Sequence, residues 1–304
     1  TYPTYFGSMT DLRSICKVAH EKGVLVLVDS AHGAHLRFLS ENMVDPIAAG
    51  ADIVTMSMHK TGGSLTQSSL LLVNQRRMDP QKVQKMLRML QTTSANYLLM
   101  SSIDVARREL ALYGKERYSV LKPIVEEAIE QIETHSRYKV LTSQYVKDQF
   151  NQTFDWTKLV VRVNGIGLTG FEVYSLLKKH YGIQMELAEG YVVMAVITSS
   201  DSRESIQRLV DALKDIEKTY GKQATMISMH VTNEHTNRLC MMPREAFYSE
   251  HESVKLTEAV GRVSADTLMI YPPGIPPFFQ AEAVSENVGV RFQYYRHFFG
   301  NVLT

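Results

Sequence analysis

Two apolar runs near the start of the sequence are each followed by side chains that can do chemistry. Asp29 ends the run at 24–28 and precedes Ser-Ala-His-Gly-Ala-His, while Lys60 closely follows the run at 51–57. A lysine amine can form a Schiff base with an aldehyde cofactor, and a carboxylate can keep a pyridine nitrogen protonated so that the ring accepts electrons. Asp29 and Lys60 together therefore indicate an aldehyde cofactor that carries a pyridine ring.

Each of these residues also has an ordinary interpretation. An aspartate after a strand often forms a turn, and a lysine at a strand end usually points into solvent. Ser57, His59 and the Gly62-Gly63 pair can hold a phosphate through a hydroxyl, an imidazole and backbone amides, but two glycines equally suit a tight turn. The residue types alone leave both interpretations open.

The elements around these residues predict an α/β sheet that would bring them together. Ser8 and Asp11 have the spacing of a capping box, and apolar residues then recur at helical intervals until Gly23. The run at 24–28 is typical of a strand buried on both faces of a parallel sheet. Further strands are expected at 51–57 and 67–74. Because ligands bind at the carboxyl ends of such strands, Asp29 and Lys60 should share one edge of the sheet.

The rest of the chain predicts two further domains. Helices are expected after Asp79-Pro80 and at 97–113 and 116–135, followed by short strands at 158–163, 184–187 and 191–198 and helices at 171–180 and 202–220. We therefore expect a large domain at 1–136 and a small α+β domain at 137–220. Residues 221–304 would hold a linker to about 239 and a C-terminal α+β segment, with a helix near 243–248 and a rigid extended loop at 268–277.

Composition excludes several classes of partner. The 304 residues are 44% hydrophobic, and Lys plus Arg total 33 against 32 Asp plus Glu, so no basic surface for nucleic acid is expected. The apolar runs are too short to span a membrane. Two cysteines, Cys16 and Cys240, exclude a disulfide framework and a multi-cysteine metal site, and they fit the cytoplasm. We expect a small-molecule ligand and no metal.

Several motifs together resemble the Orn/Lys/Arg decarboxylase family of pyridoxal-phosphate (PLP) enzymes, fold type I. The motifs extend over most of the chain, and they are Asp29-Ser-Ala-His-Gly-Ala-His35, Ser57-Met-His-Lys-Thr-Gly-Gly-Ser-Leu-Thr-Gln-Ser-Ser69, Thr92-Thr-Ser-Ala-Asn-Tyr-Leu-Leu-Met-Ser-Ser-Ile-Asp104, Gly167-Leu-Thr-Gly170, Pro243-Arg-Glu-Ala-Phe-Tyr248 and Tyr271-Pro-Pro-Gly-Ile-Pro276. Within the family, the sequence is most similar to the biosynthetic arginine decarboxylases of Bacillus-like bacteria. The resemblance implies an aspartate-aminotransferase-like large domain.

The resemblance also implies a role for each residue near the two strand ends. Lys60 would carry the cofactor as a Schiff base, Asp29 would pair with the pyridine nitrogen, and Ala31 would lie against the ring face. His32 would lie near the phenolic oxygen of the ring. Ser57 and His59 would bind the phosphate. The implied reaction is decarboxylation of a basic amino acid, arginine to agmatine in polyamine biosynthesis, with lysine or ornithine as alternative substrates.

A shared active site is implied as well. Thr93 and Ser94 match a segment that reaches the phosphate of the neighbouring subunit, so a homodimer or larger homo-oligomer is expected, although both residues also suit a helix cap before Tyr97. A basic substrate side chain needs an acidic receptor. Glu186, Glu189 and Glu282 are candidates, and none is preferred over a surface position.

The start of the sequence leads to a further expectation. The chain begins Thr-Tyr-Pro without a methionine, and the family's phosphate loop and ring-stacking histidine belong to a part of the large domain that would precede Thr1. We therefore expect a fragment whose activity belongs to the intact protein. Two rival interpretations are another fold-type I reaction, such as an aminotransferase or a lyase, and a truncated non-catalytic subunit that binds a full-length partner.

Overall fold

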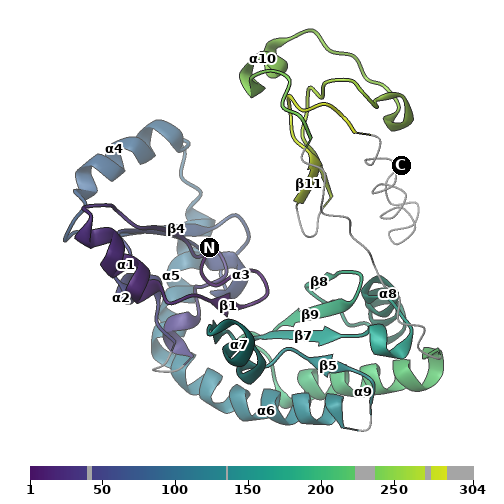
Figure 1. Ribbon diagram of the computed structural model, residues 1–304. Helices are drawn as coiled ribbons and strands as arrows, with labels where there is room; N and C mark the ends of the chain where they lie inside the picture. Colours follow the sequence, from purple (N-terminus) through teal and green to yellow (C-terminus); the bar gives the residue numbers. More distant parts are fainter. Residues whose placement is uncertain (40–42, 135, 223–236, 271–274, 286–304) are drawn as a thin grey trace. The chain divides into compact units, whose positions relative to one another are not determined.

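The computed structural model describes residues 1–39, 43–134, 136–222, 237–270 and 275–285 (Figure 1). Two compact units are found, the first comprising Thr1–Val161 with Met194–Asp215 and the second comprising Arg162–Val193 with Ile216–Thr304. The domain boundaries at 136/137 and 220/221 stay a prediction. No helix in the described ranges is long and apolar enough to cross a membrane.

The first unit contains a three-stranded sheet. Its strands β2 (Leu27–Asp29), β3 (Ile53–Ser57) and β4 (Ser69–Val73) stand in that order, with β2 parallel to β3 and β4 antiparallel to it. The three strands predicted from the sequence are therefore present, although each is shorter. Because β2 and β3 are parallel, the residues that follow them meet at one edge.

The expected burial of the first strand on both faces is wrong. Val24, Leu25 and Leu27 are 56%, 40% and 67% exposed, and β2 begins only at Leu27. The physical reason is its place in the described sheet, where β2 is an edge strand with β3 as its single neighbour. Val28, whose side chain points to the opposite face from Leu27, is buried.

The helix before this strand is confirmed, but its cap differs from the prediction. Helix α1 spans Leu12–Glu21, and its N-cap is Asp11, whose carboxylate accepts hydrogen bonds from the amide and hydroxyl of Ser14 at 3.1 and 2.6 Å. Ser8 instead belongs to the short strand β1 (Ser8–Met9), which pairs with β6 (Thr153–Phe154). Asp11 can cap the helix alone because its side chain reaches the third residue beyond it.

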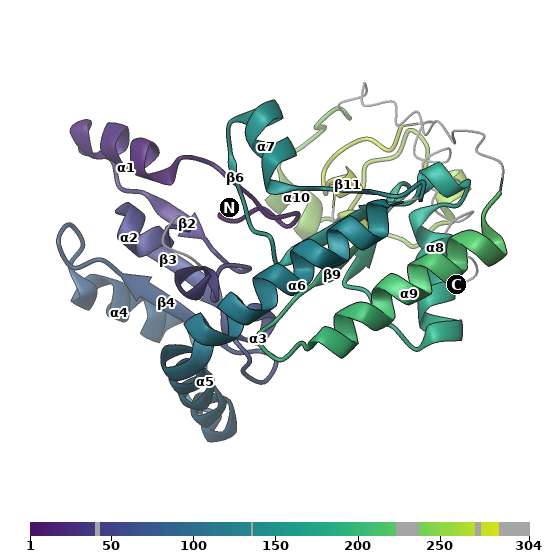
Figure 2. The ribbon, with the colours of Figure 1, turned by 90° about the horizontal axis from the view of Figure 1, so that it is seen from below.

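The first unit also contains short and long helices. The short ones are η1 (Leu36–Phe38), α2 (Pro46–Ala49) and α3 (Met58–Thr61), and the longer ones are α4 (Pro80–Leu90), α5 (Tyr97–Glu109), α6 (Lys115–Glu133), α7 (Ser143–Phe150) and α9 (Arg203–Tyr220), of which α9 runs on into the second unit. The short helix η3 (Asn164–Ile166) belongs to the second unit. A π-helical turn, η2 (Leu110–Gly114), joins α5 to α6 without a break. Helices α6 and α9 run side by side (Figure 2), and Arg203 donates to Glu127 at 2.6 Å.

A four-stranded sheet follows in the chain, and the division between the two units passes through it. Its order is β5 (Lys139–Val140), β7 (Lys158–Arg162), β9 (Val192–Val196), β8 (Leu187–Ala188). The first four residues of β7 are all buried, including the lysine that opens it. Helix α8 (Gly170–Tyr181) ends at Gly182, whose φ of +64° is the left-handed conformation that glycine adopts at low cost.

The C-terminal part of the second unit is small and loop-rich. It contains α10 (Pro243–Tyr248), η4 (Leu256–Glu258) and the antiparallel pair β10 (Leu268–Ile270) and β11 (Ile275–Phe278). The rigid extended loop expected at 268–277 is thus a pair of strands in its described parts. Residues 271–274, most of the expected linker and residues 286–304 lie outside the described residues.

Candidate active site

The carboxyl ends of β2 and β3 bring Asp29 and Lys60 to the same edge of the sheet. Asp29 lies opposite Thr55 in the parallel pair, and the amide of Ser30 donates to the Thr55 carbonyl at 2.8 Å. Lys60 stands on α3, a single helical turn that starts directly after the last residue of β3. The helical turn replaces the strand end that the sequence suggests for Lys60, and it keeps the lysine close to the edge.

The carboxylate of Asp29 is oriented without being buried. Its Oδ1 accepts a hydrogen bond from the amide of Ala31 at 2.9 Å, and the residue remains exposed. Such a turn fixes the direction of a carboxylate while leaving its outer oxygen accessible. Asp29 is therefore accessible to a ligand, and its pairing with a ring nitrogen stays a prediction.

His32 is the most constrained side chain at this edge. It is buried, with 6% of its surface exposed, and its ring lies edge-on to Tyr5 at a centroid distance of 4.7 Å. Its Nε2 lies 3.3 Å from Nζ of Lys60, and its Nδ1 lies 3.5 Å from Nζ of Lys158. Burial, followed by the charges of Lys158 and Lys60, lowers the pKa of His32 to about 3. The imidazole is therefore neutral at physiological pH.

Ser57 and His59 supply two polar groups beside Lys60. Nδ1 of His59 lies 2.9 Å from the carbonyl oxygen of Ser68, and because a carbonyl can only accept, this nitrogen carries a proton. Nε2 of His59 is thus left for a ligand. Ser57 is the N-cap of α3, but its hydroxyl makes no capping bond. Both groups are half-buried and can contribute to an anion site.

The Gly62-Gly63 pair serves as a turn. The amide of Gly62 donates to the carbonyl of Met58 at 3.0 Å and closes α3, and a Cβ at Gly62 would lie 2.8 Å from that carbonyl oxygen. Gly63 has a φ of +90°, a conformation that side-chain-bearing residues rarely adopt. Of the two interpretations of this pair, the tight turn is the one with direct structural support.

Thr93 and Ser94 lie in the exposed loop between α4 and α5. They do not cap α5, because Asn96 does so: its side chain accepts from the amides of Leu98 and Leu99 at 3.0 and 3.2 Å. The side chains of Thr93 and Ser94 make no hydrogen bond with the described residues at the strand edge. Their role at a neighbouring subunit stays a prediction.

The acidic candidates for a substrate side chain belong to the second unit. Glu186 is exposed, whereas Glu189 is half-buried and burial raises its pKa. Glu282 accepts from the amide of Phe279 at 2.8 Å and from the side chain of Asn237 at 3.3 Å. Glu282 thus holds the C-terminal segment together, and the role of Glu186 and Glu189 stays a prediction.

A buried polar cluster beside His32 is not predicted from the sequence. Asp155 accepts hydrogen bonds from the hydroxyl of Thr157 at 2.7 Å and from Nε2 of His35 at 3.0 Å, and Lys158 follows in the same turn. Burial alone would raise the pKa of Asp155, but His35 and Lys158 outweigh it and hold that pKa below its ordinary value. The cluster therefore contains a carboxylate charge in the interior.

The signal for this cluster lies in the segment Asp155-Trp-Thr-Lys158. Lys158 opens an apolar run that forms β7, and a lysine at the head of a fully buried strand needs a partner in the interior. The prediction of a strand at 158–163 does not by itself indicate that partner. His35 is likewise part of the first motif, and its partner Asp155 is 120 residues away in the chain.

The fold and this arrangement of side chains define a class of enzyme, the PLP enzymes of fold type I. The fold matches solved structures that include the constitutive lysine decarboxylase of E. coli, with a TM-score of 0.70 and 16% identity over 96% of this chain and 52% of that one. It also matches a structure of SPT with PLP, with a TM-score of 0.53 and 16% identity over 71% and 53% of the two chains. At such identities the likeness concerns the fold.

The chain belongs to the Orn/Lys/Arg decarboxylase family. The family's major domain matches residues 1–155, and its C-terminal domain matches residues 225–300. The arginine decarboxylase of Bacillus subtilis is 39% identical over 285 residues, covering 93% of this chain and 58% of that protein. The arginine decarboxylase of Bacillus anthracis is 36% identical, covering 94% and 58%. This chain thus spans about 58% of the length of these relatives.

The residues at the strand edge fit PLP as a ligand. An oriented carboxylate, an exposed lysine amine, a neutral imidazole and a free hydroxyl come from Asp29, Lys60, His32 and Ser57. These groups match the pyridine nitrogen, the aldehyde, the phenolic oxygen and the phosphate of PLP in turn.

Proposed function

We propose that this chain is part of an arginine decarboxylase that uses PLP and forms agmatine for polyamine synthesis. The observation that carries the proposal is the meeting of Asp29 and Lys60 at one sheet edge, with His32 in contact with Lys60. The choice of arginine over lysine or ornithine is supported by relatives at 36–39% identity that are named arginine decarboxylases.

Each side chain has a defined task in this proposal. Lys60 binds the cofactor through its amine, and Asp29 holds a proton at the ring nitrogen. Ala31 contacts the ring face, and Ser57 and His59 bind the phosphate. Thr93 and Ser94 bind the phosphate of the partner subunit. When bound, PLP would supply the electron sink that decarboxylation at the α-carbon of the substrate requires. Electrostatic stabilisation by Asp29 matters most while charge develops.

The test is a spectroscopic and chemical measurement on the whole protein that contains this chain. PLP is added, absorbance is recorded before and after borohydride reduction, and the modified peptide is mapped. Products are then analysed with arginine, lysine and ornithine. An adduct on Lys60 together with agmatine supports the proposal. An adduct with no amine product from any of the three would overturn decarboxylation, and a different amine would overturn the choice of arginine.

A matched pair of variants makes this test specific to the site. Lys60→Ala should remove the adduct and reduce turnover by at least about 10³-fold, because the covalent attachment and its amine are lost. Lys22→Ala removes another exposed lysine, at the end of α1, and should leave both unchanged. Equal adduct formation in the two variants would mean that PLP modifies surface lysines without a site.

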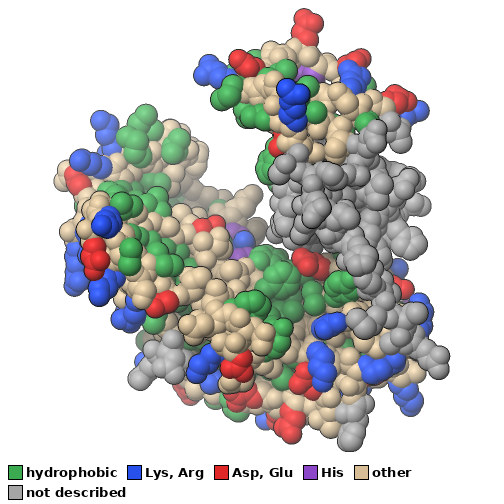
Figure 3. Space-filling model, in the orientation of Figure 1, with side chains coloured by type: hydrophobic (Ala, Val, Ile, Leu, Met, Phe, Trp, Pro, Cys, Tyr) green, Lys and Arg blue, Asp and Glu red, His purple; other side chains and the backbone are tan. Residues whose placement is uncertain are grey.

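We also propose a homodimer with shared active sites. Large apolar side chains surround the loop that carries Thr93 and Ser94: Met89, Leu90, Tyr97 and Leu98 are 71%, 86%, 77% and 75% exposed. Figure 3 shows hydrophobic side chains at the surface over α4. Exposed apolar groups of this kind mark an interaction surface. Analytical ultracentrifugation should show a dimer or larger, and Leu90→Asp should shift it toward monomer; a monomeric wild-type protein would refute the proposal.

Two smaller proposals concern the location of the protein and its domain boundaries. We propose a cytoplasmic location, because Cys16 and Cys240 are free thiols, which is the state expected in a reducing compartment. The boundaries at 136/137 and 220/221 would separate a PLP-binding domain, a small α+β domain and a C-terminal decarboxylase domain. Limited proteolysis should cut within 221–239 first if that segment is a linker.

A further inference from the structure

Lys158 is a buried cation whose position calls for an explanation. It is the first residue of β7 and its side chain is fully buried. Gly7, with a φ of +96°, forms part of its wall, and a Cβ at Gly7 would lie 2.8 Å from Cγ of Lys158. Burying an ammonium group is costly unless charged or polar partners compensate. Asp155, in the same turn, supplies an opposite charge that lowers this cost.

His32 lies between this buried lysine and the exposed Lys60. Nδ1 faces Lys158 at 3.5 Å and Nε2 faces Lys60 at 3.3 Å. A neutral imidazole has one N–H donor and one acceptor nitrogen, so it can accept from only one of two ammonium groups. The two lysines therefore compete to donate to His32. The nitrogen that accepts from a lysine carries no proton, so the other ring nitrogen carries it.

We propose that Lys158 is a positioning residue that fixes His32 as the tautomer with its proton on Nε2, the nitrogen that faces Lys60. Lys158 donates to Nδ1 as an ammonium, and it is held in place by burial and by the nearby charge of Asp155. Lys60, which is exposed, then faces an N–H group. That arrangement suits an amine that must offer its lone pair to an aldehyde.

The consequence for the cofactor rests on the proposed function. With its proton on Nε2, His32 presents a hydrogen-bond donor to whatever oxygen lies beside Lys60, and the phenolic oxygen of PLP is such an acceptor. With the proton on Nδ1, the same face of the ring would present a lone pair and would repel that oxygen. Lys158 would thus act on the cofactor through His32, without touching it.

The test reads the tautomer directly and needs no cofactor. The imidazole ¹⁵N signals of the chain are recorded at neutral pH, and those of His32 are identified among the 10 histidines by their loss in His32→Gln. We expect a pyrrole-type signal at Nε2 and a pyridine-type signal at Nδ1 in the wild-type protein. A proton on Nδ1 in the wild-type protein would overturn the proposal.

Lys158→Met keeps most of the length of the side chain and removes its charge. Lys60 is then the remaining ammonium at the ring and donates to Nε2, so the proton should move to Nδ1. Lys139→Met, an exposed lysine on the neighbouring strand β5, should leave the tautomer unchanged. A purely structural role of Lys158 predicts no change of tautomer in Lys158→Met, and that result would refute the proposal.

A second measurement covers the case in which Lys158→Met does not fold. A nuclear Overhauser contact between the ε-methylene of Lys158 and the ring of His32, together with a proton on Nε2, supports the proposal in the wild-type protein; the lack of either overturns it. Adduct formation with PLP is scored separately. If the tautomer is as proposed but no adduct forms on Lys60, the proposed function fails while this inference stands.

Discussion

The first unit contains two histidine–aspartate pairs of the same kind at different places. His35 meets Asp155 at 3.0 Å and His20 meets Asp52 at 2.8 Å, in each case through Nε2 and Oδ2. Both carboxylates are fully buried, whereas the imidazoles are 1% exposed in the first pair and 13% in the second. The first pair lies beside His32 at the carboxyl ends of the strands, and the second lies at their opposite ends.

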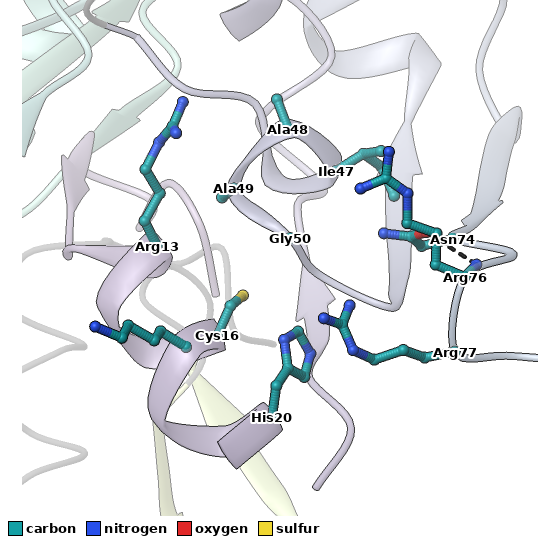
Figure 4. Close-up of a pocket in the computed structure, with 11 residues that line it drawn as sticks. Arg13, Cys16, His20, Ile47, Ala48, Ala49, Gly50, Asn74, Arg76 and Arg77 are labelled. Carbon is teal, nitrogen blue, oxygen red and sulfur yellow. Dashed lines mark hydrogen bonds between the residues drawn. The ribbon is translucent and has the colours of Figure 1, made fainter. Parts of the chain in front are cut away.

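The pair at the amino ends of the strands has a structural task. Oδ2 of Asp52 also accepts from the amide of Val26 at 2.8 Å, and the carbonyl of Asp52 accepts from the amide of Asn74 at 2.8 Å. It therefore ties the start of β3 to the chain just before β2 and just after β4. His20 and Arg77 line an open pocket of about 570 Å³, in which the guanidinium of Arg77 points toward His20 (Figure 4).

The pair at the carboxyl ends joins the loop after β2 to the turn before β7. Two further titratable groups lie near the pair, since Lys158 belongs to the same turn and His32 to the same loop, and these two contact each other. The chemistry of the two pairs is the same, so their different roles come from their neighbours and from the edge of the sheet.

The largest expected difference between the pairs concerns stability. Asp155→Ala should lower the free energy of unfolding by about 3–5 kcal/mol, because His35 and Thr157 lose their buried acceptor. Asp52→Ala should cost about 1–3 kcal/mol, since water in the open pocket can replace part of its hydrogen bonding. Urea unfolding of both variants measures this. Equal losses would show that burial of the carboxylate alone sets the cost.

Lowering the pH should reduce the free energy of unfolding, because His32 is held neutral in the folded chain. Its pKa is about 3 in the folded chain against an ordinary 6.5, so between these values the unfolded chain binds one more proton. The contribution of His32 to the free energy of unfolding is therefore fully present above about pH 6.5. It falls with decreasing pH, by up to about 1.4 kcal/mol per pH unit. Urea unfolding at pH 7, 6, 5 and 4 tests the slope.

Two variants separate His32 from other groups that titrate in this range. His32→Gln should flatten the slope by about one proton, whereas His180→Gln, at an exposed position on α8, should not change it. The groups that keep His32 neutral are Lys158, Lys60 and His35, and Asp155 opposes them. An unchanged slope in His32→Gln would mean that His32 is protonated in the folded state as well.

The comparison also explains what the sequence could and could not predict. Asp29 and Lys60 could be found because each lies next to the strand that positions it, so local periodicity and the rule for strand ends suffice. The partners of the buried Asp155 and Lys158 could not, because His35 and His32 are 120 and 126 residues away. A lysine that opens an apolar run indicates that an interior partner exists, but which residue that is depends on how the elements pack.

The exposure of β2 is a second case in which the local sequence does not determine the neighbours of an element. Its composition predicts burial on both faces, which is a statement about neighbours, and in the described sheet β2 has one neighbour. The cap of α1 and the helical turn at Lys60 differ from the prediction by a few residues, which is the range over which side-chain hydrogen bonds decide where an element begins.

The smallest expected loss of stability comes from removing Arg77, the exposed charge beside the His20–Asp52 pair. Arg77 is 43% exposed and lies 3.9 Å from Oδ1 of Asp52, so Arg77→Gln should cost less than about 1 kcal/mol, and salt should reduce that cost further. Arg76→Gln removes a guanidinium that lines the same pocket, and it should cost less still. Urea unfolding at low and high salt measures both. A loss of several kcal/mol in Arg77→Gln would mean that Asp52 depends on this charge as Asp155 depends on its buried partners, and the distinction between the two edges would then disappear.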